Sequence, residues 1–144
     1  MTPDVNVLVA ATREVHPHHA VARPWLERAV REATHSDPVT LLPMVVVGYV
    51  RVATNPRLYR PPMPTGEALA NVADLLAQPN VRLVTHGTEW PRVVELCETH
   101  GLAGDVLTDA WIAASVMQLN EHLVTFDRGF RRLLPPRHLT VLTP

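Results

Sequence analysis

Residues 2–11 read TPDVNVLVAA, an apolar and β-branched stretch with one acid, Asp4, and one amide, Asn6, set into it. This pattern is typical of a short buried strand that turns directly into the next element. A second stretch of this kind, HLVT at residues 122–125, is followed by Asp127. We therefore expect one strand near each end of the chain, each ending at or near an acid.

The sequence between these two strands alternates between helical and extended patterns. Helices are predicted over residues 17–33, 44–54, 65–77, 89–100 and 105–119, and further strands over residues 39–42, 81–85 and 139–142. Pro43 is placed to open a helix, Thr65 to cap one and Gly101 to end one, while the proline-rich residues 59–64 form a loop. This alternation predicts an α/β fold with a mostly parallel central sheet of about five strands, flanked by helices on both faces.

The composition fits one compact domain over residues 1–144, with 47% hydrophobic residues. A net charge of −1 at pH 7 lacks the broad positive field of proteins that bind nucleic acid by bulk electrostatics, so any such contact must be local. No apolar run is long enough to span a membrane, and the first residues lack a signal-peptide pattern. We expect no membrane association and a cytoplasmic location.

The basic residues are restricted to one type, since all 13 are arginine. The absence of lysine excludes phosphate-binding loops of the GxxxxGK[ST] type, Schiff-base enzymes and phosphoacceptor domains that rely on a lysine. The single cysteine, Cys97, excludes an internal disulfide and a multi-cysteine zinc site. The chemistry that remains uses carboxylate, histidine or hydroxyl groups.

Three acids are placed so that, in a parallel sheet, they would meet at the edge that binds ligands. Asp4 and Asp127 lie near strand ends, and Asp109 lies in the first turns of the helix 105–119, close to its positive dipole end. Asp105 precedes Asp109 by four residues and shares its helix face. Gathered carboxylates repel one another unless a cation joins them, and an oxygen-only cluster suits Mg²⁺ or Mn²⁺. With such an ion, the acids predict phosphodiester hydrolysis by activated water.

Each acid alone also has a purely structural interpretation. Asp4 could cap a turn and Asp105 a helix, while Asp127 could open a turn. Asp109 could simply be solvated. The structural interpretation is weaker for the set, because Asp4 interrupts an apolar strand and Asp109 faces a helix rich in alanine and isoleucine.

Five segments carry a resemblance to a known family. DVNVLVAA at residues 4–11, TDAWIAASVMQLN at 108–120 and LVTFDRGF at 123–130 resemble PIN-domain motifs in order and spacing. GYVRVATNPRLY at 48–59 and HPHHAVARPWLE at 16–27 are similar to a subgroup of bacterial VapC-like toxins. The resemblance spans nearly the whole chain and implies a PIN-like fold. It also implies a metal-dependent endoribonuclease that acts as the toxin of a type II toxin-antitoxin pair.

The resemblance also implies roles for individual residues. Asp4, Asp109 and Asp127 correspond to the catalytic acids that bind Mg²⁺ or Mn²⁺. Asn6 and Thr125 correspond to neighbouring polar positions that could orient an acid, a bound water or the substrate.

One family feature is missing from the chain. Many PIN domains place a glutamate in the second helix, whereas MVVVGYVRV at residues 44–52 has none, and Gly48 is near the expected position. The resemblance therefore implies a weaker metal site, or one completed by Asp105, Glu14 or water. Asp105 is an additional candidate catalytic ligand.

Arginines near the acids are candidates for substrate contacts. Arg51, with Arg57 and Arg60, could contact RNA phosphates or acidic groups of an antitoxin, and solvated helix ends are an equally good interpretation. Arg128 adjoins Asp127, so a phosphate role is better motivated there.

The histidines at residues 16, 18 and 19 suggest a zinc site, but Pro17 breaks the segment and no cysteine partner is apparent. We expect exposed imidazoles at the start of a helix instead.

The resemblance implies three partners: an RNA substrate, a second copy of the chain in a homodimer, and a cognate antitoxin protein whose tail blocks the crevice.

A degenerate PIN domain that binds RNA or protein without cleavage is the alternative, because the helix glutamate is missing. A phosphatase that uses Asp4 as its nucleophile is disfavoured, since the chain lacks lysine and has no second acid at residue 6.

Overall fold

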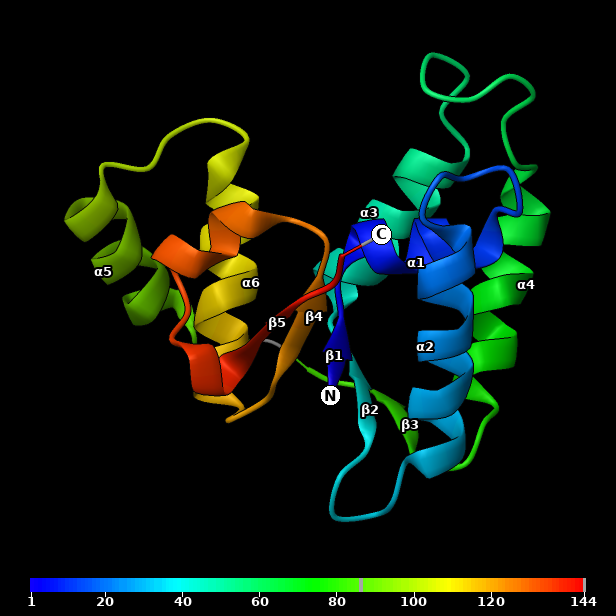
Figure 1. Cartoon of the computed structure of the whole chain (residues 1–144). Coiled ribbons are helices and arrows are strands. Elements are labelled where there is room, and N and C mark those ends of the chain that lie inside the picture. Colours follow the sequence, from blue (N-terminus) through cyan, green and yellow to red (C-terminus); the bar gives the residue numbers. More distant parts are fainter. Residues whose placement is uncertain (86, 144) are drawn as a thin grey trace.

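The computed structural model describes residues 1–85 and 87–143 and is an α/β structure with parallel strands. Within these residues five strands form two sheets, one of three strands and one of two (Figure 1). The first contains β1 (Thr2–Pro3), β4 (Leu123–Thr125) and β5 (Leu139–Val141) in the order β1-β4-β5, and the second pairs β2 (Val39–Leu41) with β3 (Val81–Leu83). The α/β class is confirmed, but the prediction of one sheet of about five strands is wrong.

Pro3 explains why the sheet is divided. The N–H groups of Thr2 and Asp4 donate to the carbonyls of His122, just before β4, and of Val124, at 2.8 and 2.9 Å, so residue 3 faces the other neighbour, β2. Proline has no N–H to donate there. Two bonds of Met1 cross the seam between β1 and β2: its carbonyl accepts the N–H of Thr40 at 2.9 Å, and its ammonium donates to the carbonyl of Pro38 at 2.7 Å. No ladder between β1 and β2 forms in the described residues.

Helices cover both sides of the strands, as predicted. They are α1 (Val5–Thr12), α2 (His19–Glu32), α3 (Pro43–Ala53), α4 (Thr65–Leu76), α5 (Trp90–His100) and α6 (Val106–Gln118). In Figure 1, α5 and α6 lie on one side of β4 and β5, while α1 to α4 lie on the other. Two short 3-10 helices, Arg128–Arg132 and Pro136–His138, precede β5. No helix in the described residues has the length and apolarity needed to cross a bilayer.

Helix α1 was not predicted, since residues 2–11 were expected to begin as a strand and no helix was expected before residue 17. The strand stops at Pro3, and Asp4 caps α1 by accepting the N–H of Val5 at 2.7 Å. The segment from Val7 to Ala11 is entirely buried. An all-apolar segment shows neither the helical nor the strand period, so burial overrides the β-branched composition.

The five predicted helices match the structure to within two residues at each end, but the predicted cap at Thr65 is wrong. Thr65 begins α4 rather than capping it, because Pro64 occupies the N-cap position and no side chain caps the helix. Pro43 opens α3 as predicted. Gly101 ends α5 with φ of 60°, the left-handed conformation in which glycine is least strained.

The core lies between the strands and the helices on each side. Tyr49, Ile112 and Phe130 are at most 2% exposed and belong to the larger cluster, which joins α3 and α6. Trp25 and Val124 belong to a second cluster, where α2 packs on the strands. The larger cluster also contains Leu123, so it joins β4 to α3 and α6.

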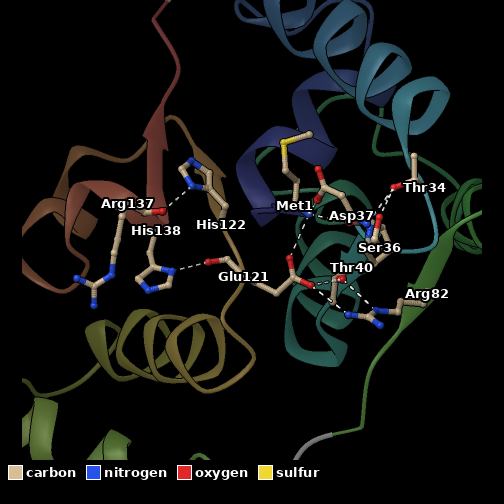
Figure 2. Close-up of polar contacts among 11 residues, drawn as sticks. Met1, Thr34, Ser36, Asp37, Thr40, Arg82, Glu121, His122, Arg137 and His138 are labelled. Carbon is tan, nitrogen blue, oxygen red and sulfur yellow. Dashed lines mark hydrogen bonds and ion pairs between the residues drawn. The ribbon is translucent and has the colours of Figure 1, made fainter.

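Glu121, just before β4, joins the two sheets through its side chain (Figure 2). It is 8% exposed. Its Oε1 accepts the hydroxyl of Thr40 in β2 at 2.5 Å and Nη2 of Arg82 in β3 at 3.3 Å, and its Oε2 lies 3.1 Å from the Met1 ammonium. Burial alone would raise the pKa of Glu121, but these donors and charges lower it below its ordinary value. The carboxylate therefore supplies contacts that the backbone lacks at this seam.

Glu121→Gln is expected to lower the free energy of unfolding by about 1.5–3 kcal/mol, the contribution of hydrogen bonds to a charged group. An acid whose folded pKa is lowered stabilises the fold above its unfolded pKa, and that contribution is lost as the pH falls through the folded pKa. The difference between variant and wild type, measured by urea unfolding, should therefore shrink in acid. Glu27→Gln, which removes the exposed pair with Arg23, is the control and should change stability by less than about 0.5 kcal/mol. Equal effects of both variants would contradict the proposed role of Glu121.

Candidate active site

An open crevice of about 720 Å³ lies beyond the carboxyl ends of β1 and β4. The structure brings all four predicted acids to it. Its lining includes Asp4, Asp105, Asp109 and Asp127, together with Asn6, His16, Gly48, Arg51 and Tyr59. This is the edge at which parallel sheets bind their ligands.

Asp4 is the most buried of these acids, at 5% exposure. Its Oδ1 accepts the N–H of Val5, and its Oδ2 accepts Nδ2 of Asn6 at 2.9 Å and the hydroxyl of Thr125 at 2.6 Å. Burial raises the pKa of Asp4, and the nearby charge of Asp127 adds to the rise, whereas these hydrogen bonds lower it. The net direction is upward, so the carboxylate is held rigidly in a place that disfavours its charge.

Thr125, at the end of β4, is the centre of the hydrogen bonds behind the acids. Its fully buried hydroxyl donates to Asp4 and accepts Nδ2 of Asn6 and the backbone N–H of Asp127, both at 2.9 Å. Asn6 also accepts the N–H of Phe126 at 3.1 Å. Asn6 and Thr125 are therefore bonded to each other and to Asp4, and their expected role in orienting an acid stays a prediction.

Asp127 lies at the start of the 3-10 helix Arg128–Arg132 and is exposed. Its Oδ1 accepts the N–H of Gly129 at 2.6 Å. One carboxylate oxygen of Asp127 therefore opens the turn, as the structural interpretation expected. The same side chain also lines the crevice.

Asp109 is half-buried in the first turn of α6, and Asp105 is the residue at the N-cap of that helix. Burial, followed by the charges of Asp4 and Asp127, raises the pKa of Asp109 to about 6. The mutual repulsion expected of gathered carboxylates is thus present in the folded chain. Asp105 forms no side-chain cap bond to α6, although it was interpreted as a possible cap.

The predicted arginines divide into two groups. Arg51, on α3, lines the crevice. Arg128 is exposed on the 3-10 helix and is not among the described residues that line the crevice, and the same holds for Glu14. The structure thus brings Arg51 to the acids but neither Arg128 nor Glu14.

Two crevice residues were not predicted. His16 was expected to be an exposed imidazole, but it is partly buried and lines the crevice. Tyr59 lines the crevice from the loop after α3, with the Arg13 guanidinium 4.0 Å from its ring centroid. The group of histidines in the HPHH segment could have drawn attention to His16 as a site residue. Nothing in the local sequence distinguished Tyr59 in this way.

The PIN domain family model matches residues 1–133 of the chain. Ribonuclease VapC31 of Mycobacterium tuberculosis (strain CDC 1551 / Oshkosh) is 35% identical over 137 residues, which cover 94% of each chain. Ribonuclease VapC25 of the H37Rv strain is 34% identical over the same share of both chains. The chain belongs to the VapC family of PIN domains.

A solved structure agrees with this assignment at the level of the fold. A chain in the crystal structure of VapBC2 from Rickettsia felis, bound to a DNA fragment from their promoter, matches with a TM-score of 0.65 and 18% identity. The match covers 97% of this chain and 96% of the other. The two chains therefore share one fold along almost their whole length.

Gly48 marks where this PIN domain departs from the expected acid pattern. A Cβ atom built on Gly48 would lie 2.7 Å from Cγ2 of Val5, a separation at which something must shift. The side chain of Val5, at the start of α1, therefore packs directly against Gly48 in α3. A glutamate at this position would require the Val5 side chain or one of the two helices to shift.

The donors of this PIN domain fit a hard divalent cation. The lining supplies carboxylates and an amide, which are the oxygen ligands that Mg²⁺ and Mn²⁺ prefer. As the side chains stand, no group of three or more histidines, cysteines or acids in residues 1–85 and 87–143 is arranged to hold a metal ion. Mg²⁺ needs only one or two direct carboxylates and completes its shell with water and substrate oxygens, so a preformed cage is not required.

Proposed function

We propose that this VapC-family PIN domain is a metal-dependent endoribonuclease that acts as the toxin of a toxin-antitoxin pair. The observation that carries the proposal is the gathering of four carboxylates in one crevice, where burial, followed by the charges of Asp4 and Asp127, raises the pKa of Asp109 to about 6. Such a cluster is unfavourable by itself and becomes favourable when a cation joins it. The relatives that share a third of the sequence are named ribonucleases, which supports RNA as the substrate.

In this proposal Asp4, Asp109 and Asp127 hold Mg²⁺ or Mn²⁺, and Asp105 adds negative charge beside them. The ion would supply a water made acidic by coordination and would offset the charge that develops on the phosphodiester. Thr125 and Asn6 keep Asp4 in one orientation, since both bond its Oδ2. Arg51 binds a phosphate of the RNA, and Arg128 contacts the strand outside the crevice.

The reaction proposed is hydrolysis of the RNA backbone. The oxygen of water forms a bond to phosphorus, the bond from phosphorus to the leaving oxygen breaks, and the proton released by water ends on that leaving oxygen. No covalent intermediate with the protein is needed, because water activated by the ion is the nucleophile.

The partners and setting form part of the same proposal. A cognate antitoxin covers the crevice, two copies of the chain form a homodimer, and the 144 residues act as one domain in the cytoplasm. The structural neighbour comes from a VapBC2 complex, which supports an antitoxin partner.

The test is cleavage of a mixed tRNA and rRNA pool by the purified protein, freed of any antitoxin. We expect discrete fragments with Mg²⁺ or Mn²⁺, and at least about a hundredfold slower cleavage after treatment with a chelator, because a large share of the catalysis depends on the ion. Re-addition of the ion should restore the fragments. Cleavage that is indifferent to the chelator would contradict a metal-dependent nuclease.

A second candidate function is RNA or protein binding without cleavage, which Gly48 favours because it stands near the position where a helix glutamate is expected. Folded protein that binds the RNA pool but leaves it intact with either ion would support this candidate.

A further inference from the structure

The loop that carries His16 is anchored next to the acids. His18 stacks on the ring of Phe126, with centroids 4.6 Å apart and planes 22° from parallel. Phe126 immediately precedes Asp127, so the stack ties the loop between α1 and α2 to the end of β4. On the other side, Nη2 of Arg13 donates to the carbonyl of Pro61 at 3.2 Å. The loop is therefore held at both ends.

The backbone of His16 is also fixed. Its N–H donates to the carbonyl of Arg13, and its carbonyl accepts the N–H of His19, both at 2.9 Å. A side chain on such a loop is presented to a ligand without the entropic cost of ordering the loop on binding.

The hydrogen bonds of His16 decide which ring nitrogen carries the proton. Nδ1 accepts the backbone N–H of His18 at 3.1 Å, so it is unprotonated and the proton of the neutral ring lies on Nε2. Burial lowers the pKa of His16, and the positive charges of His18, Arg13 and His19 lower it further, which favours the neutral ring. Nδ1 is engaged within its own loop, so Nε2, across the ring, is the nitrogen that His16 has to offer to the crevice it lines.

We propose that His16 is an RNA-binding residue whose Nε2–H donates a hydrogen bond to a phosphate oxygen of the RNA strand in the crevice. This inference rests on the proposed function, because it assumes that RNA occupies the crevice. A phosphate fits because Arg51 lines the same crevice and supplies a positive charge. The acids repel any phosphate that a cation does not bridge to them. His16 therefore contacts a phosphate that flanks the one to be cut.

Two substitutions separate substrate binding from loop structure. In His16→Gln the amide nitrogen can occupy the place of Nε2 and donate into the crevice, but the acceptor for the His18 N–H is lost. In His16→Asn the amide oxygen can replace Nδ1 and preserve the loop bond, but no donor reaches the crevice. A role in RNA binding predicts that Gln preserves function, whereas a role in loop structure predicts that Asn does.

The experiment measures binding of a fluorescein-labelled single-stranded RNA of mixed sequence by anisotropy. Every protein carries Asp109→Asn, so cleavage does not interfere. We expect His16→Asn to raise Kd about tenfold, the loss of one hydrogen bond to a charged group, and His16→Gln to stay within about twofold of the parent. His35→Gln, in an exposed turn before β2, is the control and should not change Kd. Thermal unfolding checks that each variant is folded.

The outcomes distinguish this inference from the proposed function. If His16→Asn binds RNA as tightly as the parent, or if only Asn preserves binding, the role of His16 is overturned. If the parent binds no RNA, both proposals fail. If RNA binds with the expected pattern but the unmutated protein cleaves nothing with metal, His16 keeps its role and the nuclease proposal alone is wrong.

Discussion

Asp109→Asn is expected to reduce RNA cleavage at least about a hundredfold and, in the metal-free protein at pH 7, to raise Tm. Loss of a partner of a metal ligand already costs roughly 10–100-fold, and loss of a ligand should cost more. Stability should move the other way, because the charge of Asp109 is opposed by burial and by Asp4 and Asp127. Such a gain in stability with a loss of activity is typical of active sites, where function requires charged groups that repel one another.

The pH dependence identifies the cause of the stability gain. A carboxyl whose folded pKa is raised favours folding while it is protonated, and this contribution is lost as the pH rises through about 6. The Tm difference between Asp109→Asn and wild type should therefore be small near pH 3.5 and fully developed above pH 7. Asp74→Asn, exposed on α4 outside the crevice, is the control and should show no such trend. An unchanged or lower Tm at pH 7 for Asp109→Asn would refute the repulsion argument.

A divalent ion should stabilise wild type more than the Asp109→Asn variant. Binding to the folded state raises Tm, and wild type offers one more carboxylate than the variant. We expect millimolar Mg²⁺ or Mn²⁺ to raise the Tm of wild type by more than that of Asp109→Asn, measured by scanning fluorimetry.

Thr125→Val has the second large expected effect, because it removes one hydroxyl from three hydrogen bonds while keeping the side-chain shape. The N–H of Asp127 and Nδ2 of Asn6 lose their acceptor, and Asp4 loses the donor that lowers its pKa. Burying unsatisfied polar groups costs about 1–3 kcal/mol of folding free energy. Cleavage should fall about 10–100-fold, the usual effect of removing a group that orients a metal ligand.

Thr125→Ser is the matched control for this prediction. It keeps the hydroxyl and removes one buried methyl group, which costs about 1 kcal/mol. Its cleavage rate should stay within a few-fold of wild type, and both variants are compared by single-turnover cleavage and urea unfolding. Equal cleavage by the valine and serine variants would show that the hydroxyl does not orient the acids.

The sequence was sufficient to predict the elements that carry strong periodic or terminal signals. Helices α3 and α6 lie within two residues of the predicted bounds, and the four acids line one crevice because their places relative to the strands were correct. The family resemblance added the pairing of Asn6 and Thr125 with these acids. Their individual bonds depend on β1 and β4 lying side by side, which no local pattern encodes.

The features that were missed depend on three-dimensional context. Helix α1 has no visible period because it is buried, and the effect of Pro3 on the sheet depends on which neighbour residue 3 faces. Glu121 looked like an ordinary acid before a strand, since its partners Thr40 and Arg82 are distant in sequence. The placement of His16 required the stack of His18 on Phe126.

The division of the sheet at Pro3 makes one junction of this molecule sensitive to ionic strength. Backbone ladders hold β1 to β4 and β2 to β3, and dissolved salt weakens such bonds little. Between β1 and β2, two hydrogen bonds of Met1 are supplemented by the ion pairs of Glu121 with Arg82 and with the Met1 ammonium, whose cationic partners are partly exposed. Dissolved salt screens such charges, so the electrolyte around the protein tunes the contact of β2 and β3 with β1.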